Sequence, residues 1–518
     1  MKTARQDWRA LRPARIVPAL ALSWLCGLAP CLAERINHEG RILGPAPVMT
    51  NAVLFHTPEA DAIASALQIF PRDNPWNEDI SRRPLLTNSG AMIAQIISEL
   101  SSSRRTLRPF YEMNFALVPA SQPFVPIDLF NWPEESDLGP YPIPPNLPIE
   151  GWPRATGTLT LEQWQMDINT NGGDRHAIIV QPATGFVWET WLTQRVGTNW
   201  EASNGARFNL TNNTLRPAGW TSGDAAGLCM FAGLVRYDES ERGMVEHAVR
   251  IIVKHTRRAF IYPATHYASV PSTTDPNVPA MGQRLRLKAG FIIPDSWTKQ
   301  EKAVLRGLKK YGAIVADNGG FFSISVAPDP RFPANAFNNL TSISITNFEV
   351  VQTTGPNEGP RSAGAPNASA GPDMSARAGE PTALTGTVSA TLPVQAQWRK
   401  YDGPGEVVFG NAARATTTAT FSAPGAYTLM LSADDGVHTV AYDAVQVTVA
   451  PVLTLRGSRA GTNLLLNWTG SAGLCVVERA SPLSTTNWTT VVVTNGTNLT
   501  VPISGTGVFF RVRQLGGS

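Results

Sequence analysis

One stretch of this chain cannot join a hydrophobic core, and it divides the sequence. Residues 353–368 hold no large apolar side chain and are rich in Gly, Pro and Ala. Such a composition predicts a linker, which we place at 353–369. Residues 34–352, about 320 in number, are long enough for one substantial core. Two shorter segments follow, at 370–450 and 451–518.

The first 33 residues have the pattern of a secretory signal. Five cations precede the apolar stretch from Ile16 to Leu28, and small residues lead to Ala33. The pattern predicts cleavage after Ala33. The apolar run is shorter than the roughly 20 residues that a bilayer needs, so no membrane anchor is expected. We expect a secreted protein, extracellular or periplasmic.

Removing that leader changes the charge and the cysteine count. It carries five of the 43 Lys and Arg and one of the 40 Asp and Glu, which leaves 38 against 39. A net charge near −1 gives no reason to expect nucleic acid as a partner. Cys26 and Cys31 also leave, while Cys229 and Cys475 fall in different predicted domains and apolar contexts. No disulfide is expected.

The segment 370–450 carries five ordered landmarks: Ala370-Gly-Pro-Asp, Gln397-Trp398, 424–431 (Pro-Gly-Ala-Tyr-Thr-Leu-Met-Leu), Asp435-Gly and 445–449 (Val-Gln-Val-Thr-Val). In this order they resemble a PKD domain, which implies a seven-stranded, immunoglobulin-like sandwich. The alternation of Tyr427, Leu429 and Leu431 independently predicts a half-buried strand.

The last segment, 451–518, repeats short alternating strands between Ser, Thr, Asn and Gly turns. It resembles a fibronectin type III-like sandwich. Modules of this kind in exported proteins act as spacers or weak glycan binders, and the fold does not choose between these roles. Neither C-terminal module is expected to be catalytic.

The large domain is predicted to be α+β with a mainly antiparallel sheet and a few helices. Alternation predicts a hairpin over 176–192 and further strands at 248–253, 259–262, 284–293, 313–316 and 321–326. Helices are expected at 90–100 and after Asp295, where capping residues precede an apolar stripe that ends at Tyr311-Gly312.

Several motifs in 70–330 resemble an uncharacterised group of exported bacterial proteins without an assigned activity. They are Asp73-Asn-Pro-Trp-Asn, Gly139-Pro-Tyr-Pro-Ile-Pro, Asp174-Arg-His, 219–227 (Gly-Trp-Thr-Ser-Gly-Asp-Ala-Ala-Gly) and 311–319 (Tyr-Gly-Ala-Ile-Val-Ala-Asp-Asn-Gly). The resemblance implies one shared architecture and supplies no reaction.

The first candidate site is the predicted hairpin. Strand alternation places Glu189 and Trp191 on one face, and Asp174 and His176 open the hairpin. An acid beside an indole suits a sugar site, because the ring stacks on the pyranose while a desolvated carboxyl donates a proton. The alternative is a solvated Glu paired with an Arg.

The second candidate is Asp224, which follows Trp220-Thr-Ser-Gly and precedes small residues that leave room for a ligand. It is a possible second catalytic carboxylate, and the alternative is a helix N-terminus in which Asp224 satisfies free N–H groups. The residues predicted to bind substrate are Trp188, Trp191, Trp220 and Tyr237.

A metal site is a weaker alternative. No zinc signature is present, so no cofactor is predicted, but His176, His247 and His266 are the set that would hold an ion, with His255 as a further candidate. The basic run of Arg250, Lys254, Arg257 and Arg258 predicts a solvated strand edge, with an acidic glycan as the functional alternative.

Residues 317–320, Asp-Asn-Gly-Gly, lie between two apolar runs and predict a tight hairpin turn without a catalytic role. Gly-x-Ser-x-Gly, P-loop and dinucleotide fingerprints are absent in context, which argues against α/β-hydrolases, kinases and dehydrogenases.

Together these features favour a secreted glycoside hydrolase acting on an extracellular polysaccharide, with Glu189 as general acid, Asp224 or Asp174 as its carboxylate partner, and His176 orienting one of them. The chain holds 14 Trp residues, several of them beside acids, and its sandwich modules would keep a catalytic domain near a polymer. The alternatives are a non-catalytic glycan-binding or adhesion protein and a histidine-ligated metalloenzyme. The sequence leaves the oligomeric state open.

Overall fold

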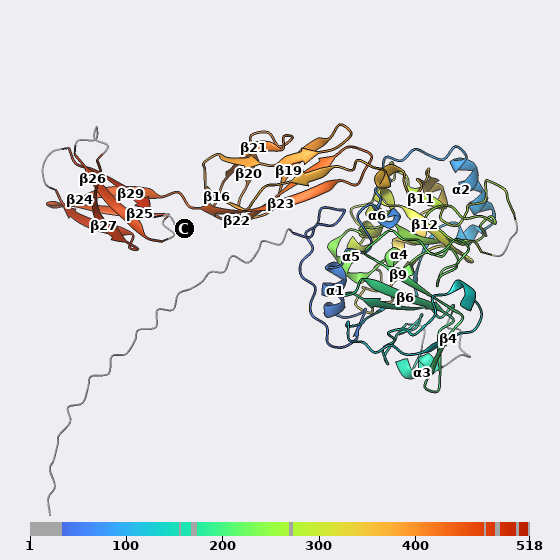
Figure 1. Ribbon diagram of the computed structural model, residues 1–518. Coiled ribbons are helices and arrows are strands. Elements are labelled where there is room, and N and C mark those ends of the chain that lie inside the picture. The colour runs from blue at the N-terminus through green and yellow to red at the C-terminus, as the bar shows by residue number, and fades with distance from the viewer. Residues whose placement is uncertain are drawn as a thin grey trace, which may run out of the picture. The chain divides into compact units, whose positions relative to one another are not determined.

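The computed structural model describes residues 34–154, 157–166, 173–268, 273–470, 473–481, 487–503 and 507–515 of the 518-residue chain. The predicted leader and its cleavage site lie outside these ranges. None of the described helices is long and apolar enough to cross a membrane. The predicted fold class is confirmed: a mixed α+β region comes first, and β-rich modules follow it (Figure 1).

Two sheets organise the large domain. The first contains, in spatial order, β1 (Val53–Leu54), β3 (Ala116–Leu117), β5 (Ala177–Gln181), β6 (Phe186–Trp191) and β9 (Asn204–Asn209). The predicted hairpin is present as the antiparallel pair β5 and β6, in which Ile178 lies opposite Glu189. Only β3 and β5 run parallel in this sheet.

The second sheet has six strands. Their order is β14 (Phe348–Val350), β11 (Arg284–Leu287), β12 (Ala313–Asn318), β10 (Val249–Val253), β13 (Phe322–Val326) and β2 (Leu107–Tyr111). Strand β10 runs parallel to β12 and antiparallel to β13. Figure 1 shows β11 and β12 of this sheet and β6 and β9 of the first within the same domain.

This strand order corrects two predictions. Residues 317–320 do not form a hairpin turn, because β10 lies between β12 and β13. Arg250 does not lie on a solvated edge, since β10 is an interior strand with a neighbour on each side. The turn prediction treated neighbours in sequence as neighbours in the sheet, which is the usual arrangement but not this one. The edge prediction rested on the run of basic residues, and Arg250 is instead buried and ion-paired.

Other expected elements differ in length. The predicted strand at 259–262 is reduced to an isolated bridge between Phe260 and Met281, and the one at 284–293 ends at Leu287. The helix expected at 90–100 is α2 (Ser89–Ser98). Short elements complete the domain, namely α1 (Pro58–Ser65), α3 (Leu161–Met166), α4 (Met230–Gly233), α5 (Tyr237–Arg242), and a small sheet of β4 (Ile127–Leu129), β8 (Asn199–Ala202) and β7 (Gln194–Val196).

Helix α6 (Lys299–Lys310) begins at the capping residues that the sequence predicts. The Thr298 hydroxyl accepts a hydrogen bond from the Glu301 N–H at 3.1 Å, and the Glu301 carboxylate accepts one from the Thr298 N–H at 3.0 Å. This reciprocal pair satisfies two backbone donors that the helix itself leaves free. Val304, Leu305 and Leu308 are fully buried in the main core.

One core joins the two sheets. Ile178, Val180 and Val187 of the first sheet belong to the same buried cluster as Ile251 and Ile324 of the second. The opposite face of the first sheet forms a separate cluster with Trp164, Trp188 and Tyr141. Since side chains alternate along a strand, β6 directs Val187 and Glu189 toward the main core and Trp188 away from it.

The two C-terminal modules consist of paired sheets. The first has the orders β16-β23-β22-β19 and β17-β21-β20, and Trp398, Tyr427 and Val447 are buried in its core. The second has the orders β24-β25-β28 and β27-β26-β29. Their strands are β15 (Asn367–Ser369), β16 (Met374–Arg377), β17 (Thr382–Thr385), β18 (Thr387–Ser389), β19 (Gln395–Asp402), β20 (Val407–Phe409), β21 (Thr416–Phe421), β22 (Gly425–Asp434), β23 (Ala441–Ala450), β24 (Thr454–Ala460), β25 (Asn463–Thr469), β26 (Cys475–Ala480), β27 (Thr489–Thr494), β28 (Asn498–Pro502) and β29 (Phe509–Gln514).

Replacing Thr298 by Ala removes the capping acceptor of α6. We expect the large domain to lose about 1 kcal/mol of unfolding free energy, the usual cost of a lost N-cap. Amide hydrogen exchange in peptides of α6 measures this loss within the multidomain chain, and the exposed Thr50→Ala is the control. Equal protection in both variants would show that the cap does not stabilise the helix.

Candidate functional site

A buried arginine lies at the centre of the large domain's polar cluster. The Arg250 side chain is 2% exposed, and its Nε lies 2.8 and 2.7 Å from the two carboxylate oxygens of Asp224. Its terminal nitrogens donate to Ser325 Oγ at 2.8 Å and to Asp317 Oδ2 at 3.3 Å. An arginine buried to this extent needs such partners, because desolvation of an unpaired charge costs several kcal/mol.

A β-bulge aims Asp317 at this arginine. Between β10 and β12 the register shifts after Ile251, so that Asp317, rather than Ala316, lies opposite Ile252. Residues 250 and 252 point to the same face of their strand, and the extra residue therefore turns Asp317 onto the face that carries Arg250. Ser325 lies on the neighbouring strand β13, opposite Arg250.

Glu112 approaches the same arginine from the end of β2. Its Oε1 accepts a hydrogen bond from Ser325 Oγ at 2.7 Å and lies 3.9 Å from Arg250 Nη1. The side chains of Glu112 and Asp317 remain 24% and 20% exposed, whereas Asp224 and Arg250 are almost completely buried. These two carboxyls are therefore the part of the cluster that solvent reaches.

Both of these carboxyls have a pKa well above that of an ordinary carboxyl. Burial, followed by the charge of Glu150, raises the pKa of Glu112 to about 7. Burial, followed by the charge of Asp224, raises the pKa of Asp317 to about 7. Arg250 acts in the opposite direction on both groups without offsetting these effects.

His176 and Glu150 form a second buried pair beside them. The Glu150 Oε2 atom accepts from His176 Nδ1 at 2.8 Å and from the His176 backbone N–H at 3.0 Å, while His176 Nε2 faces the Gly223 carbonyl at 2.9 Å. Burial lowers the pKa of His176, but the carboxylate of Glu150 outweighs burial and raises the pKa to about 10. His176 is thus an imidazolium that donates from both nitrogens.

The charges of this cluster do not balance. Asp224 is neutralised by Arg250 and Glu150 by His176, and two further carboxyls, Glu112 and Asp317, share the space with no cation of their own. Burial and the neighbouring carboxylates therefore favour the protonated form of each up to about neutral pH. Both carboxyls lie within ion-pair distance of one guanidinium, Glu112 Oε1 at 3.9 Å from Nη1 and Asp317 Oδ2 at 3.3 Å from Nη2.

The sequence-predicted residues fall into different environments. His176 and Asp224 lie in this cluster. Asp174 is exposed, and its charge contributes to the raised pKa of His176. Glu189 has no exposed surface. Its carboxylate accepts from the backbone N–H groups of Met230 and Phe231, both at 2.9 Å, and from Cys229 Sγ at 3.3 Å, so it caps α4.

Burial raises the pKa of Glu189 to about 7, but a fully enclosed carboxyl cannot reach a substrate in this conformation. Its role as general acid stays a prediction. Sequence reasoning found no signal for Glu112 or Glu150. It predicted a solvated strand edge for Arg250 and a turn without a catalytic role for Asp317. A charged residue between Val249 and Ile251 in an apolar strand was the available signal for Arg250.

The aromatic residues predicted to bind substrate are also dispersed. Trp188 is buried and packs edge-on against Phe124. Tyr237 lies beneath Arg331, whose guanidinium carbon is 3.9 Å from the ring centroid. Trp191 and Trp220 are partly exposed.

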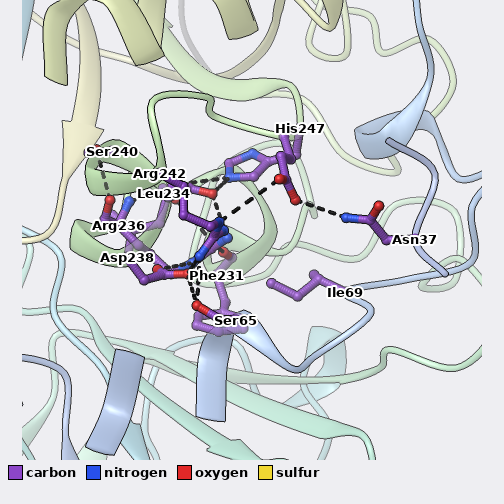
Figure 2. Close-up of polar contacts among 12 residues, drawn as sticks. Asn37, Ser65, Ile69, Phe231, Leu234, Arg236, Asp238, Ser240, Arg242 and His247 are labelled. Atoms are coloured by element: carbon purple, nitrogen blue, oxygen red, sulfur yellow. Dashed lines mark hydrogen bonds and ion pairs between the residues drawn. The ribbon is translucent and has the colours of Figure 1, made fainter. Parts of the chain in front are cut away.

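The predicted histidine set does not converge. His247 bonds to the Ala248 carbonyl at 2.7 Å and lies 3.1 Å from Glu239, within the network of Arg236, Asp238 and Arg242 that Figure 2 shows. His266 lies near Glu135 at 3.8 Å, and His255 near Glu99 at 3.3 Å. Among the described residues, no group of three or more His, Cys, Asp or Glu side chains could hold a metal ion.

The raised pKa values predict a pH-dependent stability. Between about pH 4 and 7 the folded state holds protons on Glu112 and Asp317 that the unfolded chain, with ordinary pKa values of 4.5 and 3.8, has released. Stability therefore falls as pH rises through this range, by on the order of 1–3 kcal/mol for these two partly exposed groups. Glu112→Gln, which cannot ionise, should flatten the fall.

Amide exchange in β10 and β12 between pH 4.5 and 8, corrected for intrinsic exchange rates, reads out this domain alone. The exposed Glu134→Gln is the matched control and should retain the full slope. A parent slope of zero, or an undiminished slope in Glu112→Gln, would contradict the assignment of the raised pKa.

Comparisons with known proteins match parts of the chain only. No family model matches, and no curated protein matches. Among solved structures, a nucleoside hydrolase-related hypothetical protein from Saccharophagus degradans, described as associated with carbohydrate metabolism, is 22% identical, with a TM-score of 0.14 over 15% of this chain and 21% of that one. The chain thus spans about a fifth of that protein's length.

Other matches are to PKD and immunoglobulin-like domains. The PKD domain of the KIAA 1837 protein is 26% identical, with a TM-score of 0.16 over 21% of this chain and all of that domain. Titin domains I67–I69 are 17% identical, with a TM-score of 0.15 over 22% of this chain and 45% of that one. Likenesses this partial describe modules, so the chemistry of the site is argued from its own residues.

Proposed function

We propose that this chain is an exported carbohydrate-active enzyme, a glycoside hydrolase, whose acid/base pair is Glu112 and Asp317. One observation carries the proposal: two partly exposed carboxyls, each with its pKa raised to about 7, contact the same buried guanidinium. Carboxyls with strongly perturbed pKa values cluster at functional sites, which supports this assignment.

Hydrolysis of a glycosidic bond requires these two functions together. One carboxylic acid protonates the leaving oxygen, and a carboxylate on the other side acts as base or nucleophile. Proton transfer is most efficient when the pKa lies near the working pH, and both groups meet that condition. With both pKa values near 7, one group can hold the proton that the leaving oxygen needs while the other is ionised.

The remaining members of the cluster position this pair. Arg250 fixes Asp317 and, through Ser325, the carboxyl of Glu112. Asp224 pairs with Arg250, and its own charge raises the pKa of Asp317. The His176 and Glu150 pair places one more negative carboxylate beside Glu112, which favours its protonated form.

The substrate class rests on the organisation of the chain. The predicted leader exports the protein, and the sandwich modules resemble those that hold exported enzymes at insoluble polymers. An extracellular polysaccharide is therefore the proposed substrate. Within this proposal Glu189 caps α4 and takes no part in proton transfer.

The first experiment measures release of reducing ends by the chain from residue 34 onward on a panel of plant, algal and bacterial polysaccharides. We expect Glu112→Gln and Asp317→Asn each to lower kcat/KM by at least about a hundredfold, the usual worth of a general acid or base. Glu134→Gln is the control. Full activity in both variants, or silence of the folded parent across the panel, would contradict the proposal.

Glu189→Gln separates this assignment from the one made on the sequence. If Glu189 only caps α4, any activity lost in Glu189→Gln will be accompanied by faster amide exchange in α4. The substitution replaces one of the two carboxylate oxygens that accept from the Met230 and Phe231 N–H groups. Loss of activity with α4 intact, while Glu112→Gln stays active, would return the acid role to Glu189. Treatment with EDTA tests the metalloenzyme alternative in the same assay.

Ser325→Ala tests the proposed acid more gently. Its hydroxyl donates to Glu112 and so lowers that pKa, and its loss should move the limb of the kcat/KM profile governed by Glu112 to higher pH. A shift of on the order of half a pH unit to one unit corresponds to one hydrogen bond. Ser323→Ala, which is buried two residues away on the same strand, is the matched control. A shift of this limb to lower pH in Ser325→Ala would rule out Glu112 as the group that governs it.

A further inference from the structure

A second group of side chains gathers at the surface, away from Arg250. Trp132 and Trp191 stack with their ring centroids 5.6 Å apart and an interplanar angle of 28°, and Trp132 is 38% exposed. Trp220, also partly exposed, lies 5.5 Å from the guanidinium of Arg216. Large aromatic rings held open to solvent on a folded domain are typical of binding surfaces.

The backbone fixes the stacked pair. The N–H of Trp132 donates to the Ser203 carbonyl at 3.2 Å, and the Ser203 N–H donates to the Trp191 carbonyl at 2.7 Å. Trp132 also precedes the short 3-10 helix from Pro133 to Glu135, and the Glu135 N–H donates to the Trp132 carbonyl at 3.2 Å. The rings are therefore positioned before any ligand arrives, which reduces the entropy lost on binding.

Glu135 and His266 form a polar centre beside these rings. The Glu135 carboxylate accepts from the Thr221 N–H at 3.3 Å and lies 3.8 Å from His266 Nε2, while His266 Nδ1 bonds to the Ala225 carbonyl at 2.7 Å. Both side chains are about a quarter exposed, at 27% and 24%. Each therefore keeps capacity for hydrogen bonds to a ligand.

Two further rings stack in series with His266. His266 and Tyr267 are parallel within 4°, with centroids 5.7 Å apart, and Tyr267 stacks on Phe260 at 6.3 Å and 17°. All three are partly exposed. We name Trp132, Trp191, Trp220, Glu135, His266 and Tyr267 the aromatic platform.

We propose that the aromatic platform binds a neutral polysaccharide chain, as a site separate from the acid/base pair. Sugar rings have apolar faces that stack on aromatic side chains and hydroxyl edges that bond to groups such as Glu135 and His266. Rings and polar groups held on one surface can contact more than one sugar unit of a chain. Trp191 and Trp220, which the sequence reasoning assigned to substrate, belong to this platform rather than to a catalytic centre around Glu189.

The local charge favours a neutral ligand over an anionic one. Glu134, Glu135 and Asp137 lie within one short segment, and Arg216 is paired with Asp137. Arg258 adds one cation at Tyr267, where its Nε donates to the phenol oxygen at 3.2 Å. A polyanion would therefore meet net negative charge beside Trp132. The inference does not require hydrolysis at Glu112 and Asp317, so either proposal can fail while the other stands.

Affinity electrophoresis tests the platform on the chain from residue 34 onward, with β-glucan, galactomannan and arabinoxylan as neutral probes and alginate as the anionic probe. We expect binding to at least one neutral polymer and at least about tenfold weaker binding in Trp132→Ala and in Tyr267→Ala. Phe124→Ala, which removes a 49% exposed ring elsewhere on the domain, should bind as the parent does.

Glu112→Gln separates this site from catalysis, since it should bind with parental affinity whether or not it hydrolyses the polymer. Parental binding by both platform variants would overturn the proposal and assign any binding to another part of the chain. Failure of the folded parent to bind all three neutral polymers would also overturn it. Tighter, salt-sensitive binding to alginate would refute the neutral class.

Discussion

The buried guanidinium of Arg250 is the constraint on which the large domain's interior depends. It lies on an interior strand, almost fully removed from water, and each of its bonded partners comes from a different segment: Asp224 from the loop before α4, Asp317 from β12, and Ser325 from β13. Removing one partner of such an ion costs about 3–5 kcal/mol, because the charge stays buried. The polar cluster thus ties these segments to one register, and an apolar contact in the same place would not specify it as sharply.

The same constraint sets the acidity of the site. A single arginine satisfied by Asp224 leaves Asp317 and Glu112 under-compensated, and the imidazolium of His176 is already taken by Glu150. Burial and like charge then raise both pKa values to about 7. Two carboxyls that keep protons at neutral pH are costly to stability, and proteins retain such arrangements where proton transfer is useful.

Local signals predicted much of the fold and little of this site. The capping residues of α6 and the alternation of β5 and β6 act within a few residues, so the sequence alone predicts them. Arg250 and Asp317 depend instead on β10 lying between β12 and β13 and on a one-residue bulge, and neither feature leaves a periodic trace. His176 and Asp224 were anticipated, but their partners Glu150 and Arg250 are 26 residues away in each case and could not be paired by pattern.

The segment from Trp220 to Ala226 connects the two proposed sites. Its inner side supplies Asp224 to Arg250, and its outer side supplies the Thr221 N–H to Glu135 and the Ala225 carbonyl to His266. The Ala226 N–H also bonds to the Ala316 carbonyl at 3.0 Å, next to Asp317. A polymer held on the outer side would stiffen a segment whose inner side fixes the arginine of the acid/base pair. Glycine suits residue 223 of this segment and residue 227, which follows it. A side chain at Gly223 would collide with Met230, and one at Gly227 would collide with Thr265.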